Sequence, residues 1–349
     1  MAASAGEVQL ADAALDDRIK ALSDVRVEDV AAMYTLGDEL GRGRFSVVQA
    51  ATHKVEGSRY AVKVVENITL DDEENLEALE TEIKILRQLS HPHIVQLKEV
   101  VHTAENTYIV MELLSGGELF NRIVDKGCYP EKEAAELFAQ ICISLNYLHS
   151  RDIVHRDVKP ENILFVSSES SDMKLIDFGY AGLWREDKQL TGLCGTPDYV
   201  APEVLTWYDD DENGTPYGKG SDLWSLGVLL YVILSGCSPF SADAEELLLK
   251  QVAEAKYDFF ENEWKTISDE AKDIIRRLLV ADPAERMGMA ELLEHPWVKP
   301  SADKCRVEIE RRMQAAPPAD AKPKKEPAVV GLRSTDTAGC TPKTCCSIM

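Results

Sequence analysis

The stretch His155-Arg156-Asp157-Val158-Lys159-Pro160-Glu161-Asn162, followed by Asp177-Phe178-Gly179, is the most informative part of this chain. It brings a carboxylate, a cation and two potential metal ligands together between positions 155 and 179. Transfer of a phosphoryl group from ATP requires an oriented hydroxyl and Mg²⁺ held against the phosphate charge, with little covalent chemistry from the protein. An Asp can accept the hydroxyl proton, while an Asn and a second Asp offer hard oxygen ligands. The stretch therefore predicts ATP-dependent phosphoryl transfer.

With these motifs the chain resembles eukaryotic-type protein kinases, and the matching motifs run from about residue 34 to residue 298. The resemblance implies that Asp157 is the catalytic base and that Lys159 neutralises the γ-phosphate. It also implies that Asn162 and Asp177 bind Mg²⁺. Lys159, two positions after the base, and Thr196 in Gly195-Thr196-Pro197 are typical of the serine/threonine type.

A glycine-rich segment precedes these motifs and predicts a phosphate-binding loop. Gly41 and Gly43 let the backbone approach phosphates, although Ser46 stands where a third glycine is common. The chain continues as a strand after this loop, which favours a kinase-type flap over a dinucleotide-binding turn. By resemblance, Lys63 binds the α- and β-phosphates and pairs with a helical glutamate. The spacing favours Glu82 as that partner, with Glu80 as the alternative.

The resemblance also assigns an adenine pocket with apolar walls and backbone hydrogen bonds. Met111 takes the gatekeeper position, and Glu112 to Leu114 form the hinge. Ordinary core packing is the alternative role for each apolar residue. The residues expected to enclose the base are Leu40, Val48, Ala61 and Leu164.

Regulation depends on Arg156, which helps to bind an activation-loop phosphate in such kinases. The usual acceptor position, two residues before Cys194, is Gly192 here, and Thr191 is displaced by one. Two hypotheses follow. Thr191 is phosphorylated in a shifted register, or the enzyme is active without loop phosphorylation.

Two glutamates predict a preference for basic substrates. Glu118 follows Gly116-Gly117, as in basophilic kinases, and Glu161 lies in the catalytic loop. We expect them to bind an Arg upstream of the Ser or Thr acceptor. The resemblance also implies two architectural roles: Glu203 pairs with Arg286, and Asp222 braces the catalytic loop.

The hydrophobic pattern predicts an α+β fold with two lobes. Strands are expected at 34–41, 46–53, 59–65, 95–102 and 107–112, and a helix around Leu76 to Leu86. The domain organisation is therefore an acidic, Ala-rich and partly ordered extension (1–33), a kinase domain (34–298) and a flexible tail (299–349). The strand-rich lobe covers about 34–114 and the helical lobe about 115–298.

The composition of the chain limits the binding partners and the cellular compartment that we expect. A net charge of −23 argues against nucleic acid and favours basic partners. Eight scattered cysteines and the absence of a signal-peptide pattern predict an intracellular, cytoplasmic protein. The motifs place it near the calcium/calmodulin-dependent kinases. Calmodulin is a weaker expectation, because the helical segment 303–314 mixes both charges and carries no aromatic anchor.

The C-terminus, Cys346-Ser347-Ile348-Met349, fits a farnesylation motif, and the adjacent Cys345 is a candidate for palmitoylation. These residues predict peripheral membrane association. Two other functional classes compete with an active protein kinase: a catalytically weak kinase-fold scaffold that binds nucleotide and partners, and a small-molecule kinase. The intact set of catalytic residues argues against the scaffold, and the intact segment 195–203 argues for peptide substrates.

Overall fold

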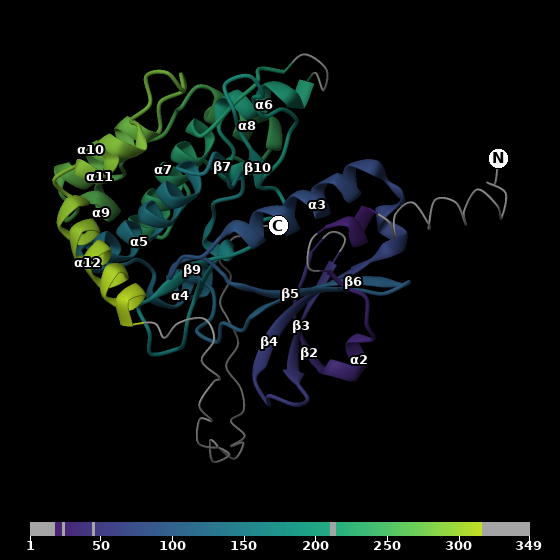
Figure 1. Cartoon of the computed structure of the whole chain (residues 1–349). Helices are drawn as coiled ribbons and strands as arrows, with labels where there is room; N and C mark the ends of the chain where they lie inside the picture. Colours follow the sequence, from purple (N-terminus) through teal and green to yellow (C-terminus); the bar gives the residue numbers. More distant parts are fainter. Residues whose placement is uncertain (1–17, 23–24, 44–45, 210–213, 316–349) are drawn as a thin grey trace, which may run out of the picture. The chain divides into compact units, whose positions relative to one another are not determined.

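The computed structural model describes residues 18–22, 25–43, 46–209 and 214–315. Its strand-rich lobe contains a six-stranded sheet in the order β1-β5-β6-β4-β3-β2, which is antiparallel except for the parallel pair of β1 and β5. The strands are β1 (Val25–Arg26), β2 (Tyr34–Arg42), β3 (Ser46–His53), β4 (Arg59–Glu66), β5 (Leu97–His102) and β6 (Asn106–Glu112). Figure 1 shows these strands grouped away from the helices of the second lobe.

One long helix, α3 (Glu73–Gln88), accompanies the sheet and contacts β5. Asp72 caps its N-terminus by accepting a hydrogen bond from the Glu74 N–H, and the acidic first turn complements the helix dipole. Apolar residues at helical spacing, from Leu76 to Leu86, are buried against the core. A short helix, α2 (Val30–Met33), and a 3₁₀ turn, η1 (Asn67–Asp71), complete this lobe.

The second lobe is mainly helical and is organised around α5 and α7. Helix α7 is buried from Ser221 to Leu234, and Trp224 stacks on Phe240 in the core. An all-round apolar helix of this kind belongs in the interior of a large domain. The helices of this lobe are α4 (Leu119–Lys126), α5 (Glu131–His149), α6 (Pro202–Asp209), α7 (Gly220–Ser235), α8 (Glu245–Ala253), α9 (Glu261–Trp264), α10 (Asp269–Leu278), α11 (Met289–Glu294) and α12 (Lys299–Ala315).

Two small antiparallel sheets frame the loops between the helices. One pairs β7 (Ile153–Val154) with β10 (Gly182–Leu183), and the other pairs β8 (Ile163–Phe165) with β9 (Met173–Leu175). The 3₁₀ turns η2 (Pro160–Asn162) and η3 (Pro197–Tyr199) lie in the same region. The two-lobed α+β fold expected from the sequence is thereby confirmed.

Segments on both sides of residues 34–298 add elements to this fold. The extension before residue 34 contributes β1 to the sheet and buries Ile19 in the core. The tail is not flexible from residue 299: α12 runs from there to Ala315, with Ala302 fully buried.

Some expectations fall outside the described residues. Cys345 and Cys346 belong to residues 316–349. Among the helices of the described ranges, none combines the length and the apolar character needed to cross a bilayer.

Candidate active site

Lys63 on β4 is paired with Glu82 on α3. Its Nζ lies 2.7 Å from Glu82 Oε1 and 2.9 Å from Oε2, and 3.4 Å from Asp177 Oδ1. The charge of Lys63 holds the pKa of Asp177 below its ordinary value. Glu80, the alternative partner, instead contacts Arg18 and Lys84. The structure thus joins the two lobes through one cation and two carboxylates.

Asp157 lies at the centre of the catalytic loop and is almost fully buried. Its Oδ2 accepts a hydrogen bond from Asn162 Nδ2 at 2.7 Å and lies 2.9 Å from Lys159 Nζ. Its Oδ1 accepts one from Thr196 Oγ1 at 2.9 Å, and that hydroxyl accepts from Lys159 Nζ at 2.7 Å. One network of charge-assisted hydrogen bonds therefore connects Asp157 with Asn162, Lys159 and Thr196.

The backbone of this loop is fixed from below by Asp222, as expected. Asp222 Oδ2 contacts His149 Nε2 at 2.8 Å and accepts from the His155 N–H at 3.0 Å, while Oδ1 accepts from the Arg156 N–H at 2.9 Å. Burial opposes ionisation of Asp222, but these hydrogen bonds lower its pKa overall. Arg156 has a φ of 66°, a conformation that costs energy for a residue with a side chain. Asp222 therefore stabilises a strained backbone beside Asp157.

Strand register brings the proposed nucleotide-binding residues together. Gly41 pairs with Val48, Val48 with Lys63, and Ala61 with Met111. The Gly43 N–H donates to the Ser46 carbonyl at 2.8 Å and so closes the loop, whose residues 44–45 are outside the described part.

The remaining walls of this site come from both lobes. Leu40 is half-exposed, and Leu164 lies on β8 opposite Glu118. At the hinge, the Glu112 carboxylate accepts from Lys174 Nζ at 2.6 Å and from the Gln96 N–H at 2.8 Å, and Leu114 follows two residues later. The hinge is thereby fixed to the helical lobe.

Glu118 and Glu161 form an acidic pair at the entrance to the helical lobe. Burial and the negative charge of Glu161 raise the pKa of Glu118. Glu161 Oε2 is buried and makes no hydrogen bond with any residue that the structure describes. Gly116 lets the segment before Glu118 pack closely against the backbone after β8, since a Cβ at this position would lie 2.4 Å from the Ser167 carbonyl oxygen. A buried carboxylate oxygen of this kind is costly unless a donor binds it.

Arg156 contacts the activation segment through a residue that the sequence analysis missed. Its Nη1 donates to the Tyr217 hydroxyl at 3.2 Å, and its Nε donates to the Tyr180 carbonyl. The Tyr217 hydroxyl in turn donates to the Gly192 carbonyl at 2.9 Å, next to the exposed Thr191. Tyr217 is separated from Arg156 by 61 positions, and no local motif marks it.

The activation segment ends at a buried ion pair, as predicted. Arg286 Nη1 and Nη2 lie 2.8 and 2.9 Å from the two carboxylate oxygens of Glu203. Arg286 also donates to the Gly220 carbonyl at 2.6 Å. The bidentate pair ties α6 to the segment before α11, and the bond to Gly220 ties that segment to the first residue of α7.

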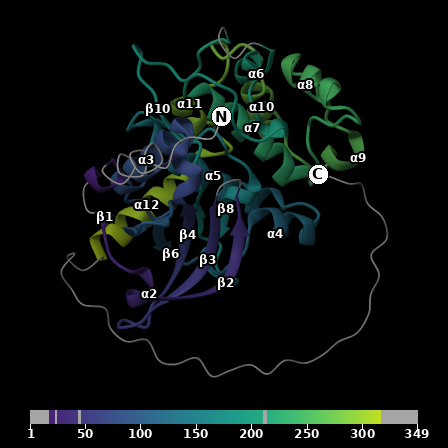
Figure 2. The same ribbon diagram turned by 90° about the vertical axis from the view of Figure 1, so that its right-hand side faces the viewer.

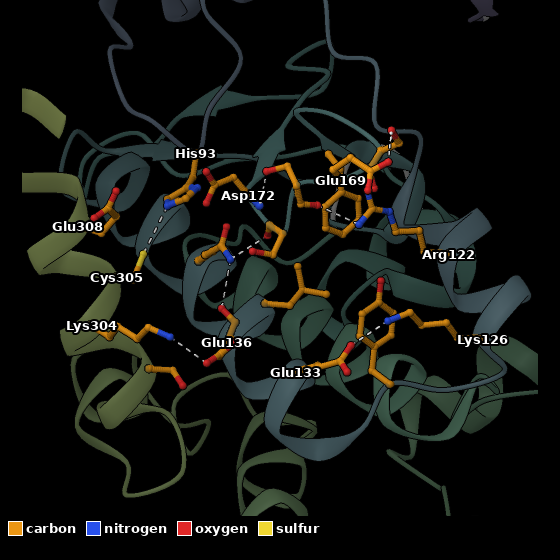
Figure 3. Close-up of a pocket in the computed structure, with 18 residues that line it drawn as sticks. His93, Arg122, Lys126, Glu133, Glu136, Glu169, Asp172, Lys304, Cys305 and Glu308 are labelled. Atoms are coloured by element: carbon orange, nitrogen blue, oxygen red, sulfur yellow. Dashed lines mark hydrogen bonds and ion pairs between the residues drawn. The ribbon is translucent and has the colours of Figure 1, made fainter. Parts of the chain in front are cut away.

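A separate cavity of 330 Å³ lies between α4, α5, α12 and the loop that joins β8 to β9. Its cations are already engaged: Lys126 contacts Glu133, and Lys304 contacts Glu136 (Figure 3). Arg122 stacks on Phe165 and donates to the Gly116 carbonyl at 3.1 Å, in the segment that precedes Glu118. None of the residues proposed for nucleotide binding lines this cavity.

Comparison with known proteins places this geometry in a family. The protein kinase domain model matches residues 34–298. Myosin light chain kinase A of Dictyostelium discoideum is 44% identical over 274 residues, which cover 78% of this chain and 90% of that protein. Calcium/calmodulin-dependent protein kinase type 1 of Macrobrachium nipponense is 42% identical over 272 residues, covering 77% and 76%. The chain belongs to the protein kinase family and is a protein serine/threonine kinase.

Proposed function

We propose that this kinase transfers the γ-phosphoryl group of Mg·ATP to Ser or Thr residues that follow basic residues. The observation that carries the catalytic part is the arrangement around two side chains, with Lys63 held by Glu82 and Asp157 held by Asn162, Thr196 and Lys159. Lys63 would bind the α- and β-phosphates of the substrate nucleotide. Asp157 would orient the acceptor hydroxyl and take its proton.

The residues present fit a magnesium site of the kind that nucleotides complete. No cluster of three or more His, Cys, Asp or Glu side chains suited to a metal occurs within the described ranges. Mg²⁺ commonly uses one or two protein ligands together with phosphate oxygens and water. Asn162 and Asp177 would supply these two ligands. The bound ion would neutralise charge on the transferred phosphoryl group.

The preference for basic residues rests on Glu118 and Glu161. The unsatisfied Oε2 of Glu161 and the raised pKa of Glu118 mark a pair of carboxylates for which the described residues provide no counter-charge. A guanidinium from the substrate would supply several hydrogen-bond donors and a positive charge. Such charge-assisted bonds contribute about 1.5–3 kcal/mol each, or roughly 10- to 150-fold in affinity.

Label transfer from ATP to matched peptides, with and without an upstream Arg, tests both parts. We expect Glu118→Gln and Glu161→Gln to raise KM for the Arg peptide and to leave the Ala peptide unaffected. Glu169→Gln, which changes an exposed acid in the same lobe, serves as the matched control. Equal use of both peptides by the parent enzyme would refute the preference. If the parent enzyme transfers no more label than the Asp177→Asn variant, the result would favour the nucleotide-binding scaffold.

We also propose that the kinase is anchored at membranes through Cys346, with Cys345 as a second acylation site. The support is the C-terminal motif alone, and a single lipid chain gives only marginal binding without a second signal. In a eukaryotic cell the parent should partition to membranes and Cys346→Ser should not. Identical cytosolic distributions would exclude this anchor.

Calmodulin is a further partner to test, because a relative is named for its dependence on calcium and calmodulin. The segment 303–314 lies in α12, where Ile309 is buried and Val307 is exposed. Binding would require that buried residue to become accessible. Activity of the full-length protein that does not change on addition of calcium–calmodulin would remove this partner.

A further inference from the structure

The residues before the kinase domain proper lie against α3, the helix that carries Glu82. Residues 18–21 are helical, Ile19 is fully buried, and Leu22 is nearly so. This purple segment lies beside α3 in both Figure 1 and Figure 2. It falls outside residues 34–298, the range that the protein kinase model matches. The contact is therefore an addition to the common domain.

Arg18 makes the polar part of this contact. Its Nε donates to Glu80 Oε1 at 2.8 Å, and its Nη1 donates to Glu73 Oε1 at 2.6 Å. Residues seven apart on an α-helix are separated by about two turns and lie on nearly the same face. One guanidinium thus spans two turns of α3. Glu80 also binds Lys84 at 2.9 Å, which keeps its carboxylate directed along that face.

Glu82 points away from Arg18. Two positions along a helix correspond to a rotation of about 200°, so Glu80 and Glu82 lie on opposite faces of α3. Arg18 pairs with Glu80 on one face of α3, while Lys63 pairs with Glu82 on the opposite face, in the candidate active site. A rotation or shift of α3 that separated Glu82 from Lys63 would also pull Glu73 and Glu80 away from Arg18.

A second attachment fixes the extension to the sheet. Val25 and Arg26 pair in parallel with Val100 and Val101 on β5, the strand that α3 contacts. The Arg26 Nε lies 3.0 Å from Glu99 Oε2 on that strand. The extension therefore contacts both the helix and the strand next to it, and neither of these contacts involves the substrate.

We propose that residues 18–22 form a built-in brace that positions α3, with Arg18 as its polar positioning residue. The brace acts through Glu73 and Glu80 to keep Glu82 on Lys63. It rests on the proposed role of the Lys63–Glu82 pair in nucleotide binding. Residues 18–22 would then contribute to activity by positioning α3, without contacting the substrate.

The test uses the full chain and compares Arg18→Glu with a charge-swapped variant that adds Glu73→Arg and Glu80→Arg. We expect Arg18→Glu to lower kcat about three- to tenfold by reducing the population with α3 in place, and to leave KM for the peptide within about twofold. Amide hydrogen exchange should increase in residues 73–88. Arg26→Ala removes an ion pair from the same extension without touching α3, so it should keep the parental kcat.

The charge-swapped variant separates positioning from general damage. Recovery of kcat and of slow exchange in α3 supports the brace. A loss of activity that the swap does not restore, or parental kcat in Arg18→Glu, overturns it. The underlying role of the pair is judged separately with Lys63→Met and Glu82→Gln. If these two keep full activity, the proposed nucleotide contact fails whatever Arg18 does.

Discussion

Replacement of Thr196 by valine would remove one hydroxyl from the centre of the catalytic network and keep the side chain's branched shape. That hydroxyl donates to Asp157 Oδ1 at 2.9 Å and accepts from Lys159 Nζ at 2.7 Å. Hydrogen bonds to charged groups contribute about 1.5–3 kcal/mol each. Asp157 keeps Lys159 and Asn162 on its other oxygen, so we count the loss of one such bond. The expected decrease in kcat/KM is roughly 10- to 150-fold.

Steady-state phosphorylation of one peptide, with ATP and peptide varied in turn, measures this loss. Thr196→Ser keeps the hydroxyl and should retain most of the activity, so it is the matched control. The reasoning is refuted if valine leaves kcat/KM within about twofold of the parent, or if serine is as damaging as valine.

Three further predictions concern the surroundings of the site. Glu203→Gln leaves the Arg286 guanidinium buried without its counter-charge, and urea unfolding should show a loss of about 3–5 kcal/mol. Gly116→Ala places a methyl group 2.4 Å from a backbone oxygen; it should cost about 1–3 kcal/mol in the same assay and raise KM for an Arg-containing peptide. Because Lys63 lowers the pKa of Asp177, the stability from this contact should be present above about pH 3.9 and be lost as pH falls through the lower folded-state pKa. A carbon-detected NMR titration should show that midpoint rising in Lys63→Met.

The two-lobed fold could be predicted because its signals are local. Strand patterns of β-branched residues and the spacing of Leu76, Leu79 and Ile83 set the small lobe, and the observed elements follow them within a few residues. The motif order also indicated which residues would meet around Asp157. The structure brings them together through strand register and the Asp222 contacts, which no spacing rule supplies.

What the sequence did not reveal depends on long-range complementarity. Arg18 meets Glu73 and Glu80 across 55 and 62 positions, and no local pattern indicates a pairing over that distance. The tail as a whole looked flexible because it contains Pro and Lys and is poor in aromatic residues, although a helix was considered over 303–314. Its helix is stabilised instead by the burial of small side chains such as Ala302. That burial depends on the surface against which the helix packs, which the segment's own sequence does not show.

The contact between Tyr217 and Gly192 has a consequence for signalling. A phosphate group is installed by one enzyme and erased by another, whereas a tyrosine hydroxyl is present for the lifetime of the protein. The hydrogen bond to the Gly192 carbonyl therefore forms without a phosphate group, and a phosphatase cannot remove it. A phosphate added at the neighbouring Thr191 would therefore act on a segment that already has an internal contact.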